Sequence, residues 1–132
     1  MKFKYKSYGA GILRPVIPIL IEYGENYVDY EVLVDSGADA CVFHADLCGI
    51  LGIDLKQGER REVGSISGVY KPYYVHPVDI TVAGKQYPMK AGFLPNIGHV
   101  PFGVVGQRGF FDLFVVTFDL IKEEIDLRPR NP

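Results

Sequence analysis

The sequence predicts a single all-β domain, a small closed barrel of mostly antiparallel strands with one or two short helices. Short runs rich in β-branched and aromatic residues recur along the 132 residues, and 15 glycines and 9 prolines interrupt them. The length is that of one domain and is enough to bury about two thirds of the unfolded surface. Because no repeat, linker or low-complexity segment divides the chain, residues 1–132 are expected to form one domain.

Strands are expected in the first third wherever β-branched or alternating apolar residues occur. They are Lys2–Lys6, Val16–Tyr23 and Val28–Val34. The last two are separated by Gly24-Glu25-Asn26, which predicts a hairpin. One short helix is expected over Ala45–Leu51, with Asp46 early in it and Gly52 at its end.

The second half continues the pattern of short strands and tight turns. Its expected strands are Arg61–Val69, Tyr73–Val82, Gln86–Phe93, Val104–Val105, Val115–Asp119 and Ile125–Leu127. Turn sequences such as Ala83-Gly84-Lys85 separate them. Pro95–Pro101 carries two prolines and is expected to be a loop, and Gly109–Phe114 is expected to form the second short helix.

Composition narrows the possible functions. The chain is 48% apolar and 23% charged, its net charge is −2 and its pI is about 5.9. This is ordinary globular composition without a basic excess, so neither nucleic acid nor a membrane surface is expected as a partner. Lys2, Lys4 and Lys6 alternate with Phe3 and Tyr5, which favours the exposed face of a strand over a nucleic-acid-binding arm.

The cysteines and the longest early apolar stretch suggest a compartment. Cys41 and Cys48 form no CxxC pair, which suits a reducing environment. The stretch Ile12–Ile21 is interrupted by an arginine and two prolines and is too short to span a bilayer, so the cytoplasm is expected. Cys41, His44 and Cys48 are loosely spaced and lack a fourth ligand, so no metal is expected.

Asp35-Ser36-Gly37 closes the apolar run Val32–Val34 and occurs once in the chain. A carboxylate at the end of a buried strand is held rigidly in the turn that follows and is partly removed from water. Ser36 can hydrogen-bond locally, and Gly37 tolerates a sharp turn. Two such carboxylates can share one proton, so that one activates a water while the other donates to a carbonyl. The single copy means that a second carboxylate must come from elsewhere.

Two further patterns follow in order. Val63–Val69 is a Gly/Ser-rich segment inside a predicted β hairpin, and Val104-Val105-Gly106 precedes Gly109-Phe110-Phe111-Asp112. With the Asp-Ser-Gly triplet they resemble the retropepsin-like aspartic proteases, whose features are an apolar-apolar-Asp-Thr/Ser-Gly-Ala signature, a glycine-rich flap and a late apolar-apolar-Gly element. The triplet alone is a weak signal, but the three elements in this order make a stronger one, and the resemblance covers the chain from about Arg14 to Leu127.

The resemblance implies an aspartic endopeptidase acting as a homodimer, in which each subunit supplies Asp35 to one active site. The two carboxyls would activate water for direct attack on a peptide bond, without a metal or an organic cofactor. Ser36 would bond across the dimer, and Gly37 would let a substrate approach closely. Ala38 stands where some relatives carry a hydroxyl, and because it cannot donate a hydrogen bond to the two carboxyls, a weakly acidic activity optimum is expected.

The resemblance also implies how a peptide or protein substrate and the partner subunit are bound. A flap with Ile66 at its tip would close over an extended peptide, and Asp39 would bind the peptide backbone while pairing with Arg14 of the partner subunit. The implied substrate-binding residues are Asp39, Gly64, Ser65, Ile66, Ser67, Val104 and Val105, and the implied dimer-interface residues are Arg14, Ser36 and Asp39. The terminal segments Lys2–Lys6 and Ile125–Leu127 are available for the interleaved strands that seal such dimers.

Several alternatives stay open. Many relatives carry arginine directly after the late glycine, whereas this chain has Gln107 and then Arg108, which would approach Asp39 from another direction. Asp39 and Arg14 can also be read as two solvated charges, the flap as a simple hairpin, and the valines as core. Because a fold does not fix a function, the rivals to a protease are a non-catalytic or weakly catalytic binding or assembly module and an inert monomer.

Overall fold

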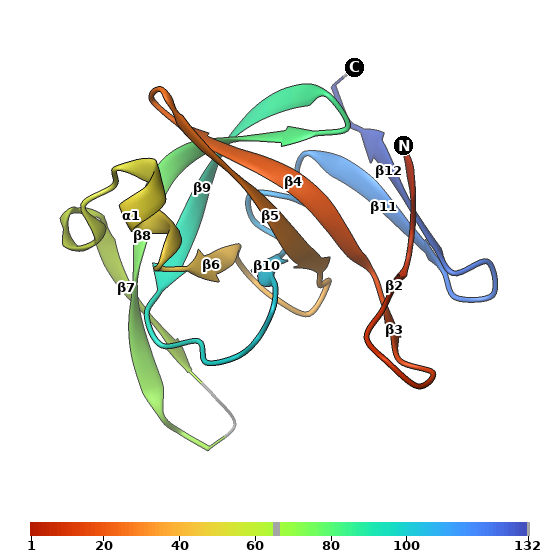
Figure 1. The fold of residues 1–132 in the computed structure, drawn as a ribbon, viewed down its shortest axis with the longest axis horizontal. Helices are drawn as coiled ribbons and strands as arrows, with labels where there is room; N and C mark the ends of the chain where they lie inside the picture. The colour runs from red at the N-terminus through yellow and green to blue at the C-terminus, as the bar shows by residue number, and fades with distance from the viewer. Residues whose placement is uncertain (65–66, 132) are drawn as a thin grey trace.

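The computed structural model describes residues 1–64 and 67–131 and is essentially all-β, as the sequence predicts. Strands and turns alternate along the whole chain, with two short helical segments between β6 and β7 (Figure 1). The elements are β1 (Lys2–Lys4), β2 (Lys6–Ser7), β3 (Leu13–Arg14), β4 (Val16–Tyr23), β5 (Asn26–Val34), β6 (Val42–His44), α1 (Leu47–Leu51), the 3₁₀ helix η1 (Leu55–Gln57), β7 (Glu59–Gly64), β8 (Tyr70–Val82), β9 (Lys85–Leu94), β10 (Gly103–Val105), β11 (Phe114–Asp119) and β12 (Glu124–Pro129).

The β4–β5 hairpin forms where the sequence predicts it. Its register runs from Val16 opposite Leu33 to Tyr23 opposite Asn26, and Gly24 turns the chain with a left-handed φ of 59°. β5 is exposed at its start and enters the core at its end, where Val32 and Val34 are buried. The strand therefore delivers the next residue, Asp35, from the core to the surface.

The largest sheet has seven strands in the order β4-β5-β10-β6-β9-β8-β7. β10 lies between β5 and β6, parallel to the first and antiparallel to the second. β4 also pairs with β8 through Leu20, Ile21 and Glu22, so the sheet curls around one core (Figure 1). This seam between β4 and β8 contains three residue pairs.

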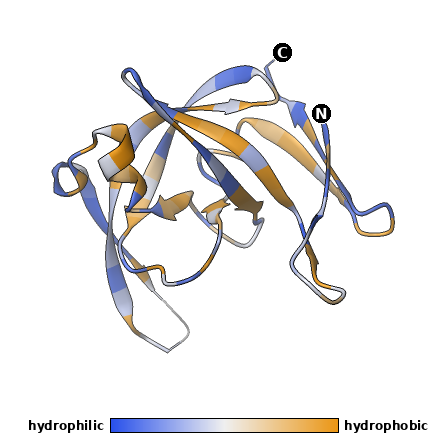
Figure 2. Ribbon diagram, viewed as in Figure 1, coloured by the Kyte–Doolittle hydropathy of each residue, from blue (hydrophilic) through white to orange (hydrophobic). Residues whose placement is uncertain are grey.

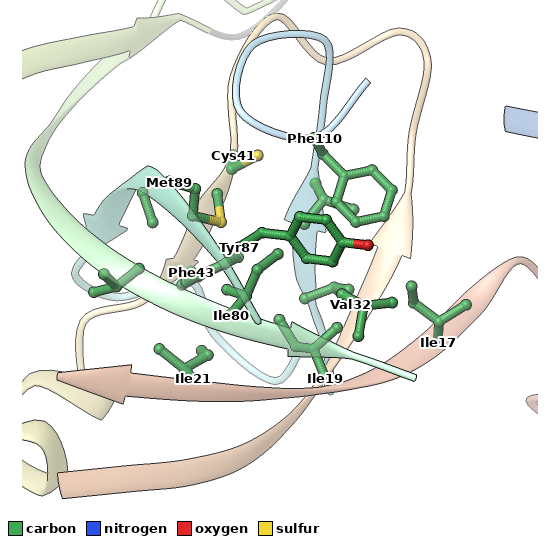
Figure 3. Packing of buried hydrophobic residues seen from close by; sticks show 14 of the residues in the cluster. Ile17, Ile19, Ile21, Val32, Cys41, Phe43, Ile80, Tyr87, Met89 and Phe110 are labelled. Atoms are coloured by element: carbon green, nitrogen blue, oxygen red, sulfur yellow. The ribbon is translucent and has the colours of Figure 1, made fainter. Parts of the chain in front are cut away.

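The core joins the strands that carry the candidate site. Figure 3 shows Ile17, Ile19 and Ile21 of β4 beside Val32 of β5 and Ile80 of β8, the two strands that pair with β4. The largest side chains without appreciable exposure are Phe43, Phe93, Phe110, Phe114, Ile17, Ile21, Leu51, Ile80, Ile125 and Leu127. Burying a side chain of this size contributes about 1.5–3 kcal/mol. Val32, Val34 and Val105 at the ends of β5 and β10 belong to the same buried core, which holds these strand ends in place.

A second sheet has the order β1-β12-β11. β1 pairs antiparallel with β12, with Lys2 opposite Asp126 and Lys4 opposite Glu124. The expected strand Lys2–Lys6 is divided, because Lys6 belongs to β2, which pairs with β3 instead. The two terminal segments available for interleaving between subunits thus pair with each other inside one chain.

The first expected helix is present and the second is not. α1 ends at Gly52, whose φ of 75° and N–H bond to the Cys48 carbonyl form a left-handed cap. The prediction of a helix over Gly109–Phe114 was wrong. This segment is a series of turns in which the Phe114 and Leu113 N–H groups both bond to the Phe110 carbonyl, and Gly109 has a left-handed φ of 99°. No helix within the described residues has the length and apolar character needed to cross a membrane.

Candidate active site

Asp35 is fixed by the strands on either side of it. Val34 lies opposite Val105 in the parallel β5–β10 pair, and the Asp35 N–H donates to the Val105 carbonyl at 3.0 Å. The Val34 N–H donates to the carbonyl of Pro15 at 2.9 Å. Since Val34 and Val105 are buried while Asp35 is half-buried, the core fixes the backbone of the aspartate and leaves its carboxyl at the surface.

The Asp35-Ser36-Gly37 turn closes around the carboxyl. The Gly37 N–H donates to Asp35 Oδ1 at 2.9 Å, and the Ala38 N–H donates to the Asp35 carbonyl at 3.2 Å. Gly37 does not have a left-handed φ, and a Cβ there would lie 3.3 Å from Asp35 Oδ1. Glycine is therefore favoured by the close approach of the carboxyl and not by an unusual backbone angle.

The segment after β10 is hydrogen-bonded to this turn. The N–H groups of Gln107 and Arg108 donate to the carbonyls of Ala38 and Asp39, at 2.8 and 3.0 Å. The Gln107 side chain adds a third bond, from Nε2 to the Ser36 carbonyl at 2.7 Å. Gln107, which stands where many retropepsin-like relatives carry arginine, thus holds the Asp35-Ser36-Gly37 turn in place. The sequence did not reveal this role.

Gly106 and Cys41 fill the space beneath the turn. A Cβ on Gly106 would lie 2.4 Å from the Ala38 carbonyl oxygen and 2.6 Å from that of Ala40, so no other residue fits without moving the backbone. Cys41 is 1% exposed, and its Sγ donates to the Arg108 carbonyl at 3.4 Å. Burial raises the pKa of the Cys41 thiol to about 11, which makes it a packing residue.

The carboxyl of Asp35 borders an open pocket of about 360 Å³. Its lining consists of Pro15, Leu33, Val34, Asp35, Ser36 and Phe118. Phe118 comes from β11, 83 positions after Asp35, and no local pattern in the sequence connects them. The pocket is apolar apart from Asp35 and Ser36, which suits a carboxyl that works beside hydrophobic groups.

The expected flap lies in the hairpin of β7 and β8, whose far end extends beyond the rest of the seven-stranded sheet (Figure 1). Gly64 lies opposite Tyr70, and a Cβ on Gly64 would lie 2.6 Å from the Tyr70 ring. Ser65 and Ile66, the expected tip, lie outside the described residues. Ser67 follows them and leads to Gly68, whose φ is 81°.

The comparisons with known proteins rest on solved structures. No family model matches the chain, and no curated protein matches it. A retropepsin-like aspartic protease from Rickettsia conorii matches with 17% identity over 95% of both chains and a TM-score of 0.65. This chain has the retropepsin-like fold. A second match is the EIAV protease complexed with the inhibitor HBY-793, at 23% identity over 76% of this chain and 88% of that one, with a TM-score of 0.49.

Within this retropepsin-like fold, the expected pair Asp39 and Arg14 is not joined inside one chain. Asp39 is exposed, and in the described part of the chain no ion pair links it to Arg14 or Arg108. The Arg14 guanidinium instead lies over the rings of Tyr8 and Phe102, at 5.2 and 5.8 Å. A contact between Asp39 and Arg14 across two subunits stays a prediction.

The remaining expected site residues differ in exposure. Val105 is 0% exposed and packs in the core, whereas Val104 is half-buried, so of this pair only Val104 has surface to offer a substrate. Within residues 1–64 and 67–131, no group of three or more His, Cys, Asp or Glu residues is placed to hold a metal ion.

Proposed function

We propose that this protein is an aspartic endopeptidase whose active site forms in a homodimer, with one Asp35 from each subunit. The supporting observation is the placement of the Asp35 carboxyl. It is held by backbone bonds at the end of a core strand and borders an open pocket, in a chain with the retropepsin-like fold. Asp35 is half-buried and Ser36 and Gly37 are exposed, so a second copy of the chain can approach this turn.

The reaction follows from two carboxyls that share one proton. The ionised carboxylate removes a proton from a bound water, and the water oxygen attacks the carbonyl carbon of the peptide bond. The protonated carboxyl donates its proton to the carbonyl oxygen. The carboxyl that is now protonated then donates its proton to the amide nitrogen while the other, ionised carboxyl removes a proton from one hydroxyl of the tetrahedral diol. The C–N bond breaks to release a carboxylic acid and an amine, and one proton stays on the pair of carboxyls.

The surrounding residues position this chemistry. The Gly37 N–H holds one oxygen of Asp35, so the other oxygen is directed away from the turn. The Gln107 amide and the N–H groups of Gln107 and Arg108 keep the turn from moving during the reaction. The β7–β8 hairpin is long enough to cover an extended peptide, whose backbone would pair with it as an added strand.

Peptide cleavage by the Asp35→Asn variant tests this function. We expect the wild-type protein to cleave members of a peptide library and Asp35→Asn to lose activity by about 10²- to 10⁴-fold, since general acid and base catalysis is removed together. Asp54→Asn is the matched control, because Asp54 is an exposed carboxylate beside η1 without a side-chain cap bond. Equal cleavage by wild type and Asp35→Asn would remove Asp35 from the mechanism. A well-folded wild type that cleaves nothing would support the binding-module alternative.

A further inference from the structure

The two edges of the β1-β12-β11 sheet differ in how they are protected. Among the described strands, β1 and β11 each pair with β12 alone, so both are edge strands. The β1 edge carries exposed Lys2 and Lys4, and Lys6 follows directly. Charged residues, and lysine in particular, keep an edge strand from pairing with another chain. The β1 edge is therefore protected against pairing with another chain, and it is called the guarded edge below.

The β11 edge lacks this protection. Between Phe114 and Phe118 the strand carries no charge, and Val115 and Phe118 are 41% and 40% exposed. In the turn that follows, Leu120 and Ile121 are 70% and 91% exposed. Figure 2 shows hydrophobic colouring along β11 and at the tip of the hairpin beyond it. A long uncharged edge with exposed aliphatic and aromatic side chains is typical of a surface that another chain covers.

This edge adjoins the candidate active site. Phe114, Val116 and Phe118 alternate onto one face of β11, and they change from buried to half-buried to exposed as the strand leaves the core. Phe118, at the exposed end, lines the pocket that contains Asp35 and Ser36. A partner that pairs with β11 would therefore also reach the rim of the Asp35 pocket.

We propose that the β11 edge pairs with the β11 edge of a second copy of this chain, antiparallel and about a two-fold axis. This inference rests on the proposed function, because a single Asp35 needs a second carboxyl and only another copy supplies the same one. A strand that pairs antiparallel with itself is symmetric, as a two-fold interface requires. The result is one continuous sheet in the order β1-β12-β11-β11-β12-β1.

The register of such a pair brings the two active-site halves together. If Thr117 lies at the axis, Phe118 of one copy faces Val116 of the other, so both Phe118 side chains lie close to the axis. Each Phe118 shares a pocket with the Asp35 of its own chain, so both Asp35 residues approach the same axis. The exposed side chains of Leu120 and Ile121 of each copy come beside the first residues of the other β11. There they are removed from water, which stabilises the dimer.

This arrangement differs from interleaved terminal strands. β1 already pairs with β12 through Lys2, Phe3 and Lys4, and interleaving would have to break that pairing first. Pairing through β11 keeps every hydrogen bond of the three-stranded sheet and adds new ones to the free N–H and C=O groups of its edge.

Lysine substitutions on the β11 edge test the interface. Val115→Lys and Thr117→Lys place charges on exposed positions of this edge, where a lone subunit tolerates them. We expect the wild type to sediment as a dimer, and the doubly substituted protein to have half that mass and no peptide cleavage while its circular dichroism is unchanged. Ile50→Lys is the matched control, because Ile50 is 56% exposed on α1, and it should keep both the mass and the activity of the wild type.

A cysteine cross-link provides a second measurement that does not depend on the lysine variants. A residue at a two-fold axis faces its own copy, so Thr117→Cys should form a disulfide-linked dimer under mild oxidation. Cys41 and Cys48 are buried, so they do not compete. Lys2→Cys, on the guarded edge, should stay unlinked. A dimer that survives both lysines, together with no cross-link at residue 117, would overturn the proposed interface.

The same experiments separate this interface from the proposed function. If the double variant Asp35→Asn and Thr117→Cys forms the disulfide-linked dimer while the wild type cleaves no peptide, the β11 interface is supported and the protease function is contradicted. Full cleavage by the protein that carries both lysines would contradict the interface while the function stands.

Discussion

At the scale of single residues, the geometry of the site depends most on Gly106. Gly106→Ala would place a methyl group 2.4 and 2.6 Å from two backbone oxygens of the aspartate turn. Because backbone cannot rotate away as a side chain can, we expect the free energy of unfolding to fall by about 1–3 kcal/mol, and peptide cleavage to fall with it. Urea unfolding measures the first and a peptide assay the second. Gly49→Ala is the control, since nothing lies within 4 Å of its Cβ, and equal stability of the two variants would contradict this role.

Gln107 is expected to act as a positioning residue. Gln107→Ala removes the bond from Nε2 to the Ser36 carbonyl but leaves the two backbone bonds of the segment intact. Loss of one such bond is worth about 0.5–1.5 kcal/mol, so we expect kcat to fall by about 2- to 10-fold. KM should change little, and the melting temperature should fall by a few degrees at most, since the same bond also stabilises the fold. Gln86→Ala, on the exposed turn end of β9, is the control. A change in KM alone would indicate that Gln107 binds substrate instead.

The sequence predicts some of these residues and not others. Asp35 and Gly106 stand in short local patterns, in which an apolar strand ends in a turn or in a glycine, and such patterns can be read directly from the chain. The contacts of Gln107 and Phe118 cannot be read in this way, because their partners are 71 and 83 positions away in the chain. Sequence spacing carries no information on which side chain reaches across two strands.

At the scale of elements, glycines at turns predict the ends of strands and helices better than the spacing of hydrophobic residues predicts the helices themselves. Gly24 and Gly52 mark a hairpin and a helix end correctly, because both adopt the left-handed φ that glycine favours. Phe110, Phe111 and Phe114 have the spacing of a helical face, yet they form turns that bury Phe110 and Phe114 with ring centroids 5.0 Å apart. A single turn satisfies this spacing as well as a helix does, so tertiary packing decides between them.

The parallel pairs that fix Asp35 are also beyond local prediction. β5 pairs with β10 and β6 with β9, in both cases over three residues. β6 and β10 have only three residues each and therefore weak sequence signals. Their position is set by the core, in which Phe43 of β6 packs against Phe93 of β9. The all-β class is predictable from the sequence, whereas the strand order that holds the Asp35-Ser36-Gly37 turn is not.

At the scale of the whole molecule, buried acids should make the protein sensitive to alkali. Burial raises the pKa of the Cys41 thiol from 9.0 to about 11 and that of the Tyr30 hydroxyl from 10.0 to about 12. When the pH lies between the ordinary pKa of such a group and its raised pKa in the folded protein, the unfolded chain loses a proton that the folded protein keeps. The free energy of unfolding is therefore unaffected by these groups below about pH 9 and falls as the pH rises toward 12. The slope is at most about 1.4 kcal/mol per pH unit for each group. Urea unfolding at several pH values measures it, and Cys41→Ala should reduce the slope between pH 9 and 11. An unchanged slope would contradict the assignment.

Subunit mixing tests whether one active site needs two chains. When wild type and Asp35→Asn exchange subunits in equal amounts, random pairing yields about one quarter wild-type dimers, one half mixed dimers and one quarter variant dimers. Under the proposed function a mixed dimer has one Asp35 carboxyl where two are required, so activity per total protein should fall to about one quarter of that of the wild type. Independent sites in each chain would leave about one half. The comparison needs only a cleavage rate before and after exchange, with Asp54→Asn as the mixing partner in the control. Because that control should keep full activity, a value near one half for Asp35→Asn would show that each chain works alone and would exclude a shared pair of Asp35 carboxyls.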